Sequence, residues 1–276
     1  MAHPTATMTV PRFLPSLLLG AATAVQLASG TITLDRLYDD WSFTTAKLSP
    51  STSPACLAAY RAPIACPETL LGLAASMRTV FKPTPADFDL TCTPSCADSV
   101  DAYLHGLITA CTLPTDGAPK VLGSGNSGEY AAQPEPVHVI GWILQYTLAR
   151  SCARKDNSTG TGTYCYFDQG PANNKFECSD ACEMQFYASA HDYPGAGWRF
   201  NHYNLIDQTS WWEEYFVGGW ERAVGCGAVE RRPRYADVKA VLAEVEAKKK
   251  GTGEGEEGSV AMARLRVQFE RVVRGD

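Results

Sequence analysis

The chain has 276 residues, a formal net charge of -6 and 45% hydrophobic residues. This balance indicates a globular protein with a buried core and excludes a fibrous or wholly disordered chain. The negative charge also disfavours a general nucleic-acid binder, which needs a basic surface to displace the counterions of phosphates.

The N-terminal residues 1–30 have the layout of a secretory signal peptide. Arg12 gives a short positive region, residues 13–27 form an uncharged apolar run, and the small residues 28–30 follow. This run is shorter than the ~20 residues that span a bilayer, which argues against the alternative of a membrane anchor. No later segment is apolar enough to cross a membrane. We therefore expect a secreted, extracellular protein.

All ten cysteines lie in the block 31–230, which we predict to be one disulfide-rich domain with five disulfides. Disulfides persist in oxidising compartments, so this distribution supports secretion. The cysteines are Cys56, Cys66, Cys92, Cys96, Cys111, Cys152, Cys165, Cys178, Cys182 and Cys226. Five lie in each half of the series, so full pairing requires at least one bond between the halves.

Two C-x3-C pairs, Cys92 with Cys96 and Cys178 with Cys182, separate their cysteines by one helical turn. In a helix both members face the same side, which favours bonds to neighbouring segments over a bond within the pair. A zinc site would usually show shorter cysteine spacing and histidine partners. We therefore expect no metal site and no cofactor. The sequence leaves the connectivity of the disulfides open.

The segments between the cysteines carry apolar residues at helical spacing, so we predict a mainly α domain with long loops. Helices are expected over 68–77, over 97–110 with Ser95 as N-cap, over 137–153, and from the N-cap Ser179 to about Ala190. Loops rich in turn-forming residues are expected over 112–135 and 156–175, the second with a short strand at 163–167.

Residues 231–276 form a cysteine-free tail with 11 Lys or Arg and 8 Asp or Glu, a net charge of +3. The block 31–230 carries 12 and 22 of these residues, a net charge of -10. Segments 235–250 and 260–274 have helical patterns, and the linker GTGEGEEG joins them. We predict a charged, helical or flexible tail that packs weakly against the body.

No nucleophile signature of a known hydrolase occurs in the chain, so no catalytic residue is assigned. A glycosidase needs two carboxylates about 5 to 10 Å apart, and the Asp and Glu residues within 192–221 are the candidates. Glu213 and Glu214 are adjacent and point apart, which favours a solvated helix face. His191 and His202 flank a turn-rich loop in the same stretch, and a metal or acid/base site there is a further alternative. A carbohydrate-active enzyme that uses this segment stays the alternative to a non-catalytic protein.

The segment from Phe186 to Trp220 holds 11 aromatic residues among 35, against 10% in the whole chain. The spacing of Trp212, Phe216 and Trp220 fits one helical face, which favours packing in a core. The alternative is an exposed platform on which sugar rings stack. Its candidate glycan contacts are Trp198, Trp211, Trp212 and Trp220.

Asn157 is the predicted glycosylation site. It begins Asn157-Ser158-Thr159, the only N-x-[ST] sequon of the chain. The surrounding loop is rich in Gly and Thr and would tolerate a glycan in the secretory pathway.

A characteristic order of cysteines and short motifs is seen in four runs and a closing VGCG. The runs are LSPSTSPACLAAYRAPIACPETLLGLA, LTCTPSCADSVDAYLHGLITAC, EPVHVIGWILQYTLARSCARKDNSTGTGTYCYF and FECSDACEMQFYASA. Over about residues 41–228, this order resembles the cysteine-rich region of secreted ascomycete proteins that usually carry LysM chitin-binding modules. The chain shows no LysM module, and its CSDAC is one residue longer than the CSDC-like element of that family. The resemblance implies a secreted fungal protein with a disulfide-linked helical region, and the chitin-binding residues of that family have no positions in this chain to map onto. Our own hypothesis is a non-catalytic, LysM-effector-like protein that contacts cell-wall or host glycans. A structural cell-wall component is a further alternative.

Overall fold

The computed structural model describes residues 30–122, 134–156, 162–168, 175–201, 204–208, 210 and 212–234. The predicted signal peptide, apart from Gly30, lies outside the described residues. So do the glycosylation site Asn157 and the tail from Tyr235 onward.

The prediction of a mainly helical, disulfide-rich domain is confirmed in the described residues. The α-helices are α1 (Pro54–Tyr60), α2 (Thr69–Ala75), α3 (Pro85–Thr91), α4 (Pro94–Ala110), α5 (His138–Ser151), α6 (Ala181–Asp192) and α7 (Val217–Gly225). Short 3-10 turns are η1 (Thr45–Lys47), η2 (Cys165–Phe167) and η3 (Pro194–Gly197), and η4 (Trp212–Phe216) is a π-helical turn. The predicted strand at 163–167 is wrong, because its last three residues form η2.

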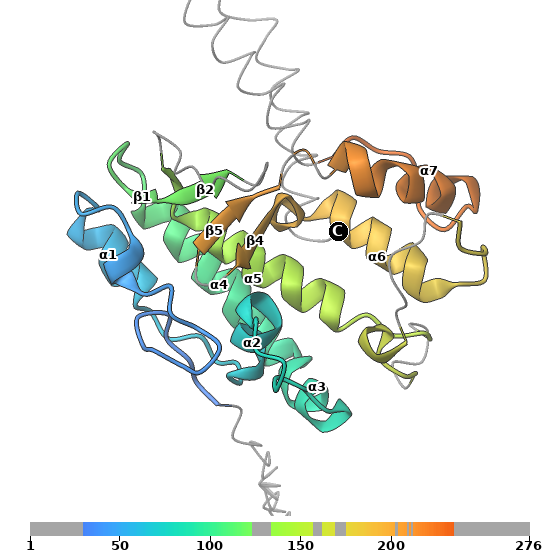
Figure 1. The fold of residues 1–276 in the computed structure, drawn as a ribbon, viewed down its shortest axis with the longest axis horizontal. Helices are drawn as coiled ribbons and strands as arrows, with labels where there is room; N and C mark the ends of the chain where they lie inside the picture. Colours follow the sequence, from blue (N-terminus) through green and yellow to red (C-terminus); the bar gives the residue numbers. More distant parts are fainter. Residues whose placement is uncertain are drawn as a thin grey trace, which may run out of the picture.

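The central element is α5, with α6 and α7 on one side and α1 and α2 on the other (Figure 1). Its residues are apolar on nearly all faces, as expected for a helix with packing partners all round. Residues such as Ile140 and Leu144 are fully buried in the first of two cores. Gly141 allows α4 to approach closely, since a Cβ at this position would lie 2.9 Å from the Leu104 Cδ1 atom.

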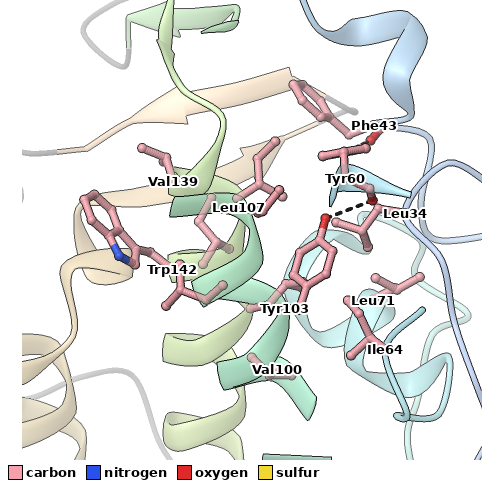
Figure 2. Close-up of a cluster of buried hydrophobic side chains, with 14 of the residues drawn as sticks. Leu34, Phe43, Tyr60, Ile64, Leu71, Val100, Tyr103, Leu107, Val139 and Trp142 are labelled. Atoms are coloured by element: carbon pink, nitrogen blue, oxygen red, sulfur yellow. Dashed lines mark hydrogen bonds between the residues drawn. The ribbon is translucent and has the colours of Figure 1, made fainter. Parts of the chain in front are cut away.

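The first core joins the N-terminal segment to α1, α2, α4 and α5 (Figure 2). The second core lies between α6 and α7 and includes Tyr146 of α5. Helix α5 therefore contributes to both cores and connects them.

Two small sheets occupy the predicted loop 112–135 and the chain after α6. Strands β1 (Gly117–Ala118) and β3 (Glu135–Pro136) pair antiparallel. Strand β2 (Lys120–Leu122) runs parallel to β5 (Asn204–Asp207), which pairs antiparallel with β4 (Trp198–Asn201). These strands place Lys120 beside Asp207, with Nζ and Oδ2 3.3 Å apart.

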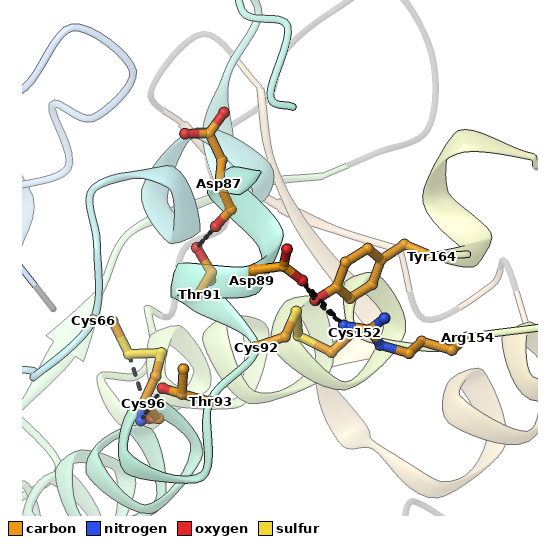
Figure 3. Close-up of a disulfide and its surroundings, with 10 residues drawn as sticks. All are labelled: Cys66, Asp87, Asp89, Thr91, Cys92, Thr93, Cys96, Cys152, Arg154 and Tyr164. Atoms are coloured by element: carbon orange, nitrogen blue, oxygen red, sulfur yellow. Dashed lines mark hydrogen bonds and ion pairs between the residues drawn. A yellow bond between two sulfur atoms is a disulfide. The ribbon is translucent and has the colours of Figure 1, made fainter. Parts of the chain in front are cut away.

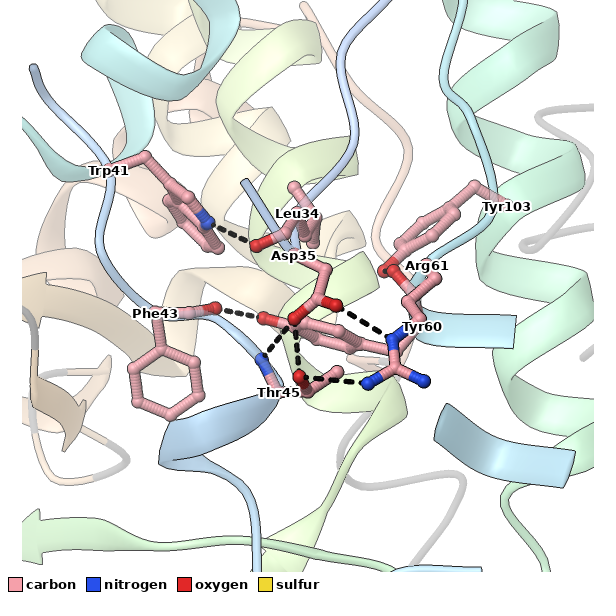
Figure 4. A network of polar contacts seen from close by, with 8 residues as sticks. All are labelled: Leu34, Asp35, Trp41, Phe43, Thr45, Tyr60, Arg61 and Tyr103. Atoms are coloured by element: carbon pink, nitrogen blue, oxygen red, sulfur yellow. Dashed lines mark hydrogen bonds and ion pairs between the residues drawn. The ribbon is translucent and has the colours of Figure 1, made fainter. Parts of the chain in front are cut away.

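A polar network fixes the N-terminal segment to the end of α1 (Figure 4). The buried Tyr60 hydroxyl donates to the Phe43 carbonyl oxygen. Asp35 accepts from the Thr45 amide at 2.9 Å and pairs with Arg61 at 2.7 Å. Residues that lack regular secondary structure are thereby held against the core.

The N-caps differ from the expected serines. The Thr93 hydroxyl accepts the Cys96 amide at 3.2 Å, because Pro94 takes the first helical position of α4, where its missing N–H is no loss. The Asp180 carboxylate accepts the Glu183 amide at 3.1 Å and caps α6. Ser95 lies inside α4, and Ser179 precedes the cap of α6.

Five disulfides use all ten cysteines: Cys56–Cys111, Cys66–Cys96, Cys92–Cys152, Cys165–Cys182 and Cys178–Cys226. Cys92–Cys152 is the bond between the two halves that the odd count required (Figure 3). The C-x3-C cysteines pair outward, as predicted. The prediction that both cysteines of each pair share one helical turn is wrong. Cys92 is the C-cap residue of α3 while Cys96 belongs to α4, and Cys178 precedes α6, which contains Cys182.

Candidate functional site

The tryptophans predicted as glycan contacts do not form an exposed platform in the described residues. Trp212 and Trp220 are buried in the second core, and the Trp220 ring stacks on His191 with centroids 3.6 Å apart. Trp198 is half-buried and has the Lys120 ammonium 5.2 Å from its ring centroid. Trp211 lies outside the described residues. The helical face that carries Trp212 and Trp220 packs against α6, which removes both indoles from solvent.

Most of the carboxylates predicted as enzyme candidates within 192–221 lie in separate ion pairs, whereas Glu214 is hydrogen-bonded to Tyr215. Asp192 pairs with Arg232, Glu221 with Arg231, and Glu213 lies 3.8 Å from Arg234.

The pKa values of two of these carboxyls do not suit an acid catalyst. Burial raises the pKa of Asp192, but hydrogen bonds from His191 and Arg232 outweigh it and hold the pKa below its ordinary value. The hydrogen bond from Arg231 lowers the pKa of Glu221. Both groups are therefore carboxylates at neutral pH, whereas a general acid must hold a proton.

His191 is a buried side chain whose two ring nitrogens both contact hydrogen-bond partners, and it is not exposed to a ligand. Its Nδ1 lies 2.8 Å from Asp192 Oδ1, and its Nε2 lies 3.0 Å from the Arg232 carbonyl oxygen. His202 lies outside the described residues. Within the described part of the chain, no group of three or more His, Cys, Asp or Glu residues is placed to hold a metal ion.

The exposed aromatic surface lies elsewhere, at the contact of α3 with η2. Phe88, Tyr164, Tyr166 and Phe167 form a cluster that we call the aromatic corner. Phe88 is fully buried, and its ring centroid lies 5.1, 4.9 and 5.0 Å from those of the other three. Tyr166 and Phe167 remain 40% and 39% exposed, with their rings at 82° to each other. The corner therefore offers two differently oriented aromatic surfaces to solvent.

Polar side chains border the aromatic corner (Figure 3). The Tyr164 hydroxyl donates to Asp89 Oδ1 at 2.8 Å, and the Arg154 guanidinium lies 3.7 Å from the Tyr164 ring centroid. Burial and the bond to Asp89 raise the pKa of Tyr164 to about 12, so the phenol keeps its proton. The Asp89 side chain is 64% exposed, which leaves it accessible to a ligand.

The aromatic corner is held in place by covalent and packing constraints. Cys165 is buried and bonded to Cys182 of α6, which fixes the turn that carries Tyr166 and Phe167. The aromatic corner is not among the sites that the sequence predicts. Its signal was the run Tyr-Cys-Tyr-Phe, in which a disulfide-bonded cysteine separates aromatic residues.

Comparison with protein-family models, curated proteins and solved structures finds no match to this chain. The molecule itself shows a cysteine-rich, disulfide-bonded helical protein of the kind that oxidising compartments maintain. No helix in the described part of the chain is long and apolar enough to cross a lipid bilayer.

Proposed function

We propose that this is a secreted, non-catalytic protein that binds cell-wall or host glycans through the aromatic corner. The observation that carries the proposal is the exposure of Tyr166 and Phe167 on a fully buried Phe88. Sugar rings present apolar C–H faces that stack on aromatic rings, and rings held by a packed core lose little conformational entropy on binding.

The border of the aromatic corner suits the hydroxyl groups of a sugar. Asp89 can accept hydrogen bonds from hydroxyls, and Arg154 can donate to them. These two side chains already contact Tyr164, so they lie at the edge of the aromatic surface. A ligand with an apolar ring face and a polar edge matches this arrangement.

Three further observations support an extracellular location, an effector-like role and a non-catalytic function. The five disulfides and the signal-like N-terminus favour an extracellular location. The resemblance of the cysteine order to LysM-bearing ascomycete proteins favours a fungal, effector-like role at a wall or host surface. The ion pairs of the carboxylates within 192–221 favour binding over hydrolysis.

The test measures retention of the recombinant protein, with its disulfides verified, on insoluble chitin, β-glucan, cellulose and mannan. We expect retention on at least one polymer and about tenfold weaker binding of the Tyr166→Ala and Phe167→Ala variants. Tyr215→Ala is the matched control, because Tyr215 is 51% exposed on η4 and lies outside the aromatic corner.

Failure of the wild-type protein to bind any polymer would overturn the proposal and favour a structural wall component. Equal losses in Tyr166→Ala and Tyr215→Ala would show that the aromatic corner is not the binding surface. Release of soluble sugar from a bound polymer would instead favour the carbohydrate-active enzyme.

A further inference from the structure

A second candidate site lies between α4 and α5, beside the Cys92–Cys152 disulfide. The hollow has a volume of about 320 Å³, at the lower end of the range of small-molecule sites. Its wall consists mainly of apolar or small groups: Ala97, Val100, Leu148, Ala149, the Cys92–Cys152 disulfide and Tyr193. We call this hollow the α4–α5 groove.

A second hollow of about 360 Å³ lies next to the α4–α5 groove, along α6. The two hollows share Ala149, Cys152 and Tyr193, and Ser189 and Asp192 of α6 also line the second. The two hollows therefore adjoin at these three residues.

The charge of the lining has one sign. Among the described residues that line the two hollows, Asp101 and Asp192 are the charged ones, and no Lys, Arg or His joins them. Burial raises the pKa of Tyr193, and the carboxylates of Asp101 and Asp192 raise it further. A negative potential at the phenol is consistent with this shift.

The two carboxylates differ in how far they are neutralised. Asp192 pairs with Arg232. Asp101 accepts the Gln145 amide at 2.9 Å, and within the described residues it has no cation in ion-pair range. Asp101 is exposed at the edge of the α4–α5 groove, and it is therefore the lining group that can pair with a positively charged ligand.

We propose that the α4–α5 groove binds a small organic cation, with the apolar body of the ligand in the hollow and its ammonium group against Asp101. The apolar wall supplies burial, and the Asp101 carboxylate selects for positive charge. This site is distinct from the aromatic corner, so it adds a second ligand class to the proposed glycan binding.

The test titrates the full chain with octylammonium, 1-octanol and octanoate by isothermal titration calorimetry. The three probes share an apolar body and differ in charge. We expect one octylammonium per chain, about tenfold weaker binding of 1-octanol and no detectable binding of octanoate. Equal affinity for the three probes would overturn the proposal.

Matched variants locate the site. Asp101→Asn should weaken octylammonium binding about tenfold and leave 1-octanol unchanged. Asp98→Asn changes an exposed carboxylate of the same helix that does not line the groove, and it should leave both affinities unchanged. Ala149→Phe should fill the point shared by both hollows and weaken every probe that binds.

Three results would contradict the assignment. Octylammonium binding that survives in folded Ala149→Phe protein places the ligand elsewhere, and equal losses in Asp98→Asn and Asp101→Asn show a general charge effect. A chitin oligomer that binds here, and is blocked by Ala149→Phe, would replace the cation as ligand. Tyr166→Ala should leave the octylammonium titration unchanged, which separates this test from that of the glycan proposal.

Discussion

Single polar side chains join segments of this protein that lie far apart in the chain. The Tyr60 hydroxyl reaches the Phe43 carbonyl oxygen, and the Tyr103 hydroxyl donates to the Tyr60 carbonyl oxygen at 3.1 Å (Figure 4). Both phenols are buried, and burial raises their pKa values well above 10.0. Such groups stabilise a fold only while their partners are present, because a buried polar atom without a partner carries a large desolvation cost.

Tyr60→Phe should lower the free energy of unfolding by about 2 kcal/mol, because the buried Phe43 carbonyl oxygen loses its donor. Urea unfolding followed by circular dichroism measures the change. Tyr166→Phe removes a hydroxyl from a 40% exposed ring and should change stability by less than about 0.5 kcal/mol. A similar loss in both variants would show that the hydroxyl of Tyr60 has no special structural role.

The Asp40–Arg78 pair should make part of the stability depend on pH. The hydrogen bond from Arg78 lowers the pKa of Asp40 below 3.8, against the opposing effect of burial. A carboxyl with a lower pKa in the folded than in the unfolded state stabilises the fold above its unfolded pKa. That contribution is lost as the pH falls through the folded pKa.

Asp40→Asn should therefore lose less stability than the wild type between pH 7 and pH 2, although it is less stable at pH 7. Asp39→Asn is the control, because Asp39 contacts the same arginine at 2.9 Å but its side chain is 78% exposed. Thermal unfolding across this pH range measures both effects. An unchanged pH dependence in Asp40→Asn would contradict the assignment.

At the scale of elements, close backbone contacts around α5 decide how the two cores meet. A Cβ on Gly195 of η3 would lie 2.1 Å from the Trp142 carbonyl oxygen of α5. Gly106 of α4 has no atom within 4 Å of the corresponding position. The two glycines therefore have different roles, although neither has a left-handed backbone.

Gly195→Ala should lower the free energy of unfolding by about 2 to 3 kcal/mol, since η3 must move away from α5. Gly106→Ala should leave stability unchanged or raise it by up to about 1 kcal/mol, because alanine is the better helix former. Chemical unfolding of the two variants tests this contrast. Equal effects of the two substitutions would refute the close-contact explanation.

Helix positions were largely predictable from the 3.6-residue pattern. The range 137–153 is observed as His138–Ser151, because a long apolar run fixes a buried helix well. Helix α3 was missed although Thr84 and Asp87 carry a capping-box signal, with the Thr84 amide donating to Asp87 Oδ2 at 2.7 Å. The caps of α4 and α6 were placed wrongly because several polar residues stand side by side there.

Site exposure was far less predictable than the helices. Tryptophan is large and is rarely fully buried even where most of it is covered, so Trp212 and Trp220 could be assigned to a core or to a platform. Their burial depends on the packing of α7 against α6. The exposure of Tyr166 and Phe167 depends likewise on Phe88, which belongs to a distant part of the chain. Exposure is a tertiary property that a periodic pattern does not contain.

At the scale of the whole molecule, the two halves are joined by one disulfide and by α5. Cys92–Cys152 closes a sequence separation of 60 residues, whereas Cys165–Cys182 closes one of 17. In the chain-entropy account a bond that closes the longer loop removes more freedom from the unfolded state. The bond between the halves is therefore expected to stabilise the fold more than the local one.

Replacing Cys92 and Cys152 together by alanine should lower the free energy of unfolding by about 4 kcal/mol, against about 3 kcal/mol for Cys165 with Cys182. Urea unfolding under non-reducing conditions measures both values. The opposite order would show that packing at the turn η2, rather than loop length, dominates.

Because of the same disulfide connectivity, a single cut in the backbone can leave two fragments that stay covalently linked. Cys56–Cys111 and Cys66–Cys96 lie wholly before residue 112, and Cys165–Cys182 and Cys178–Cys226 lie wholly after residue 151. A protease that cleaves once between these positions leaves two fragments, each with two disulfides of its own, tied by Cys92–Cys152 alone. Such a nicked protein would migrate as one species on a non-reducing gel and as two after reduction, so a mature two-chain form would escape detection until a thiol is added.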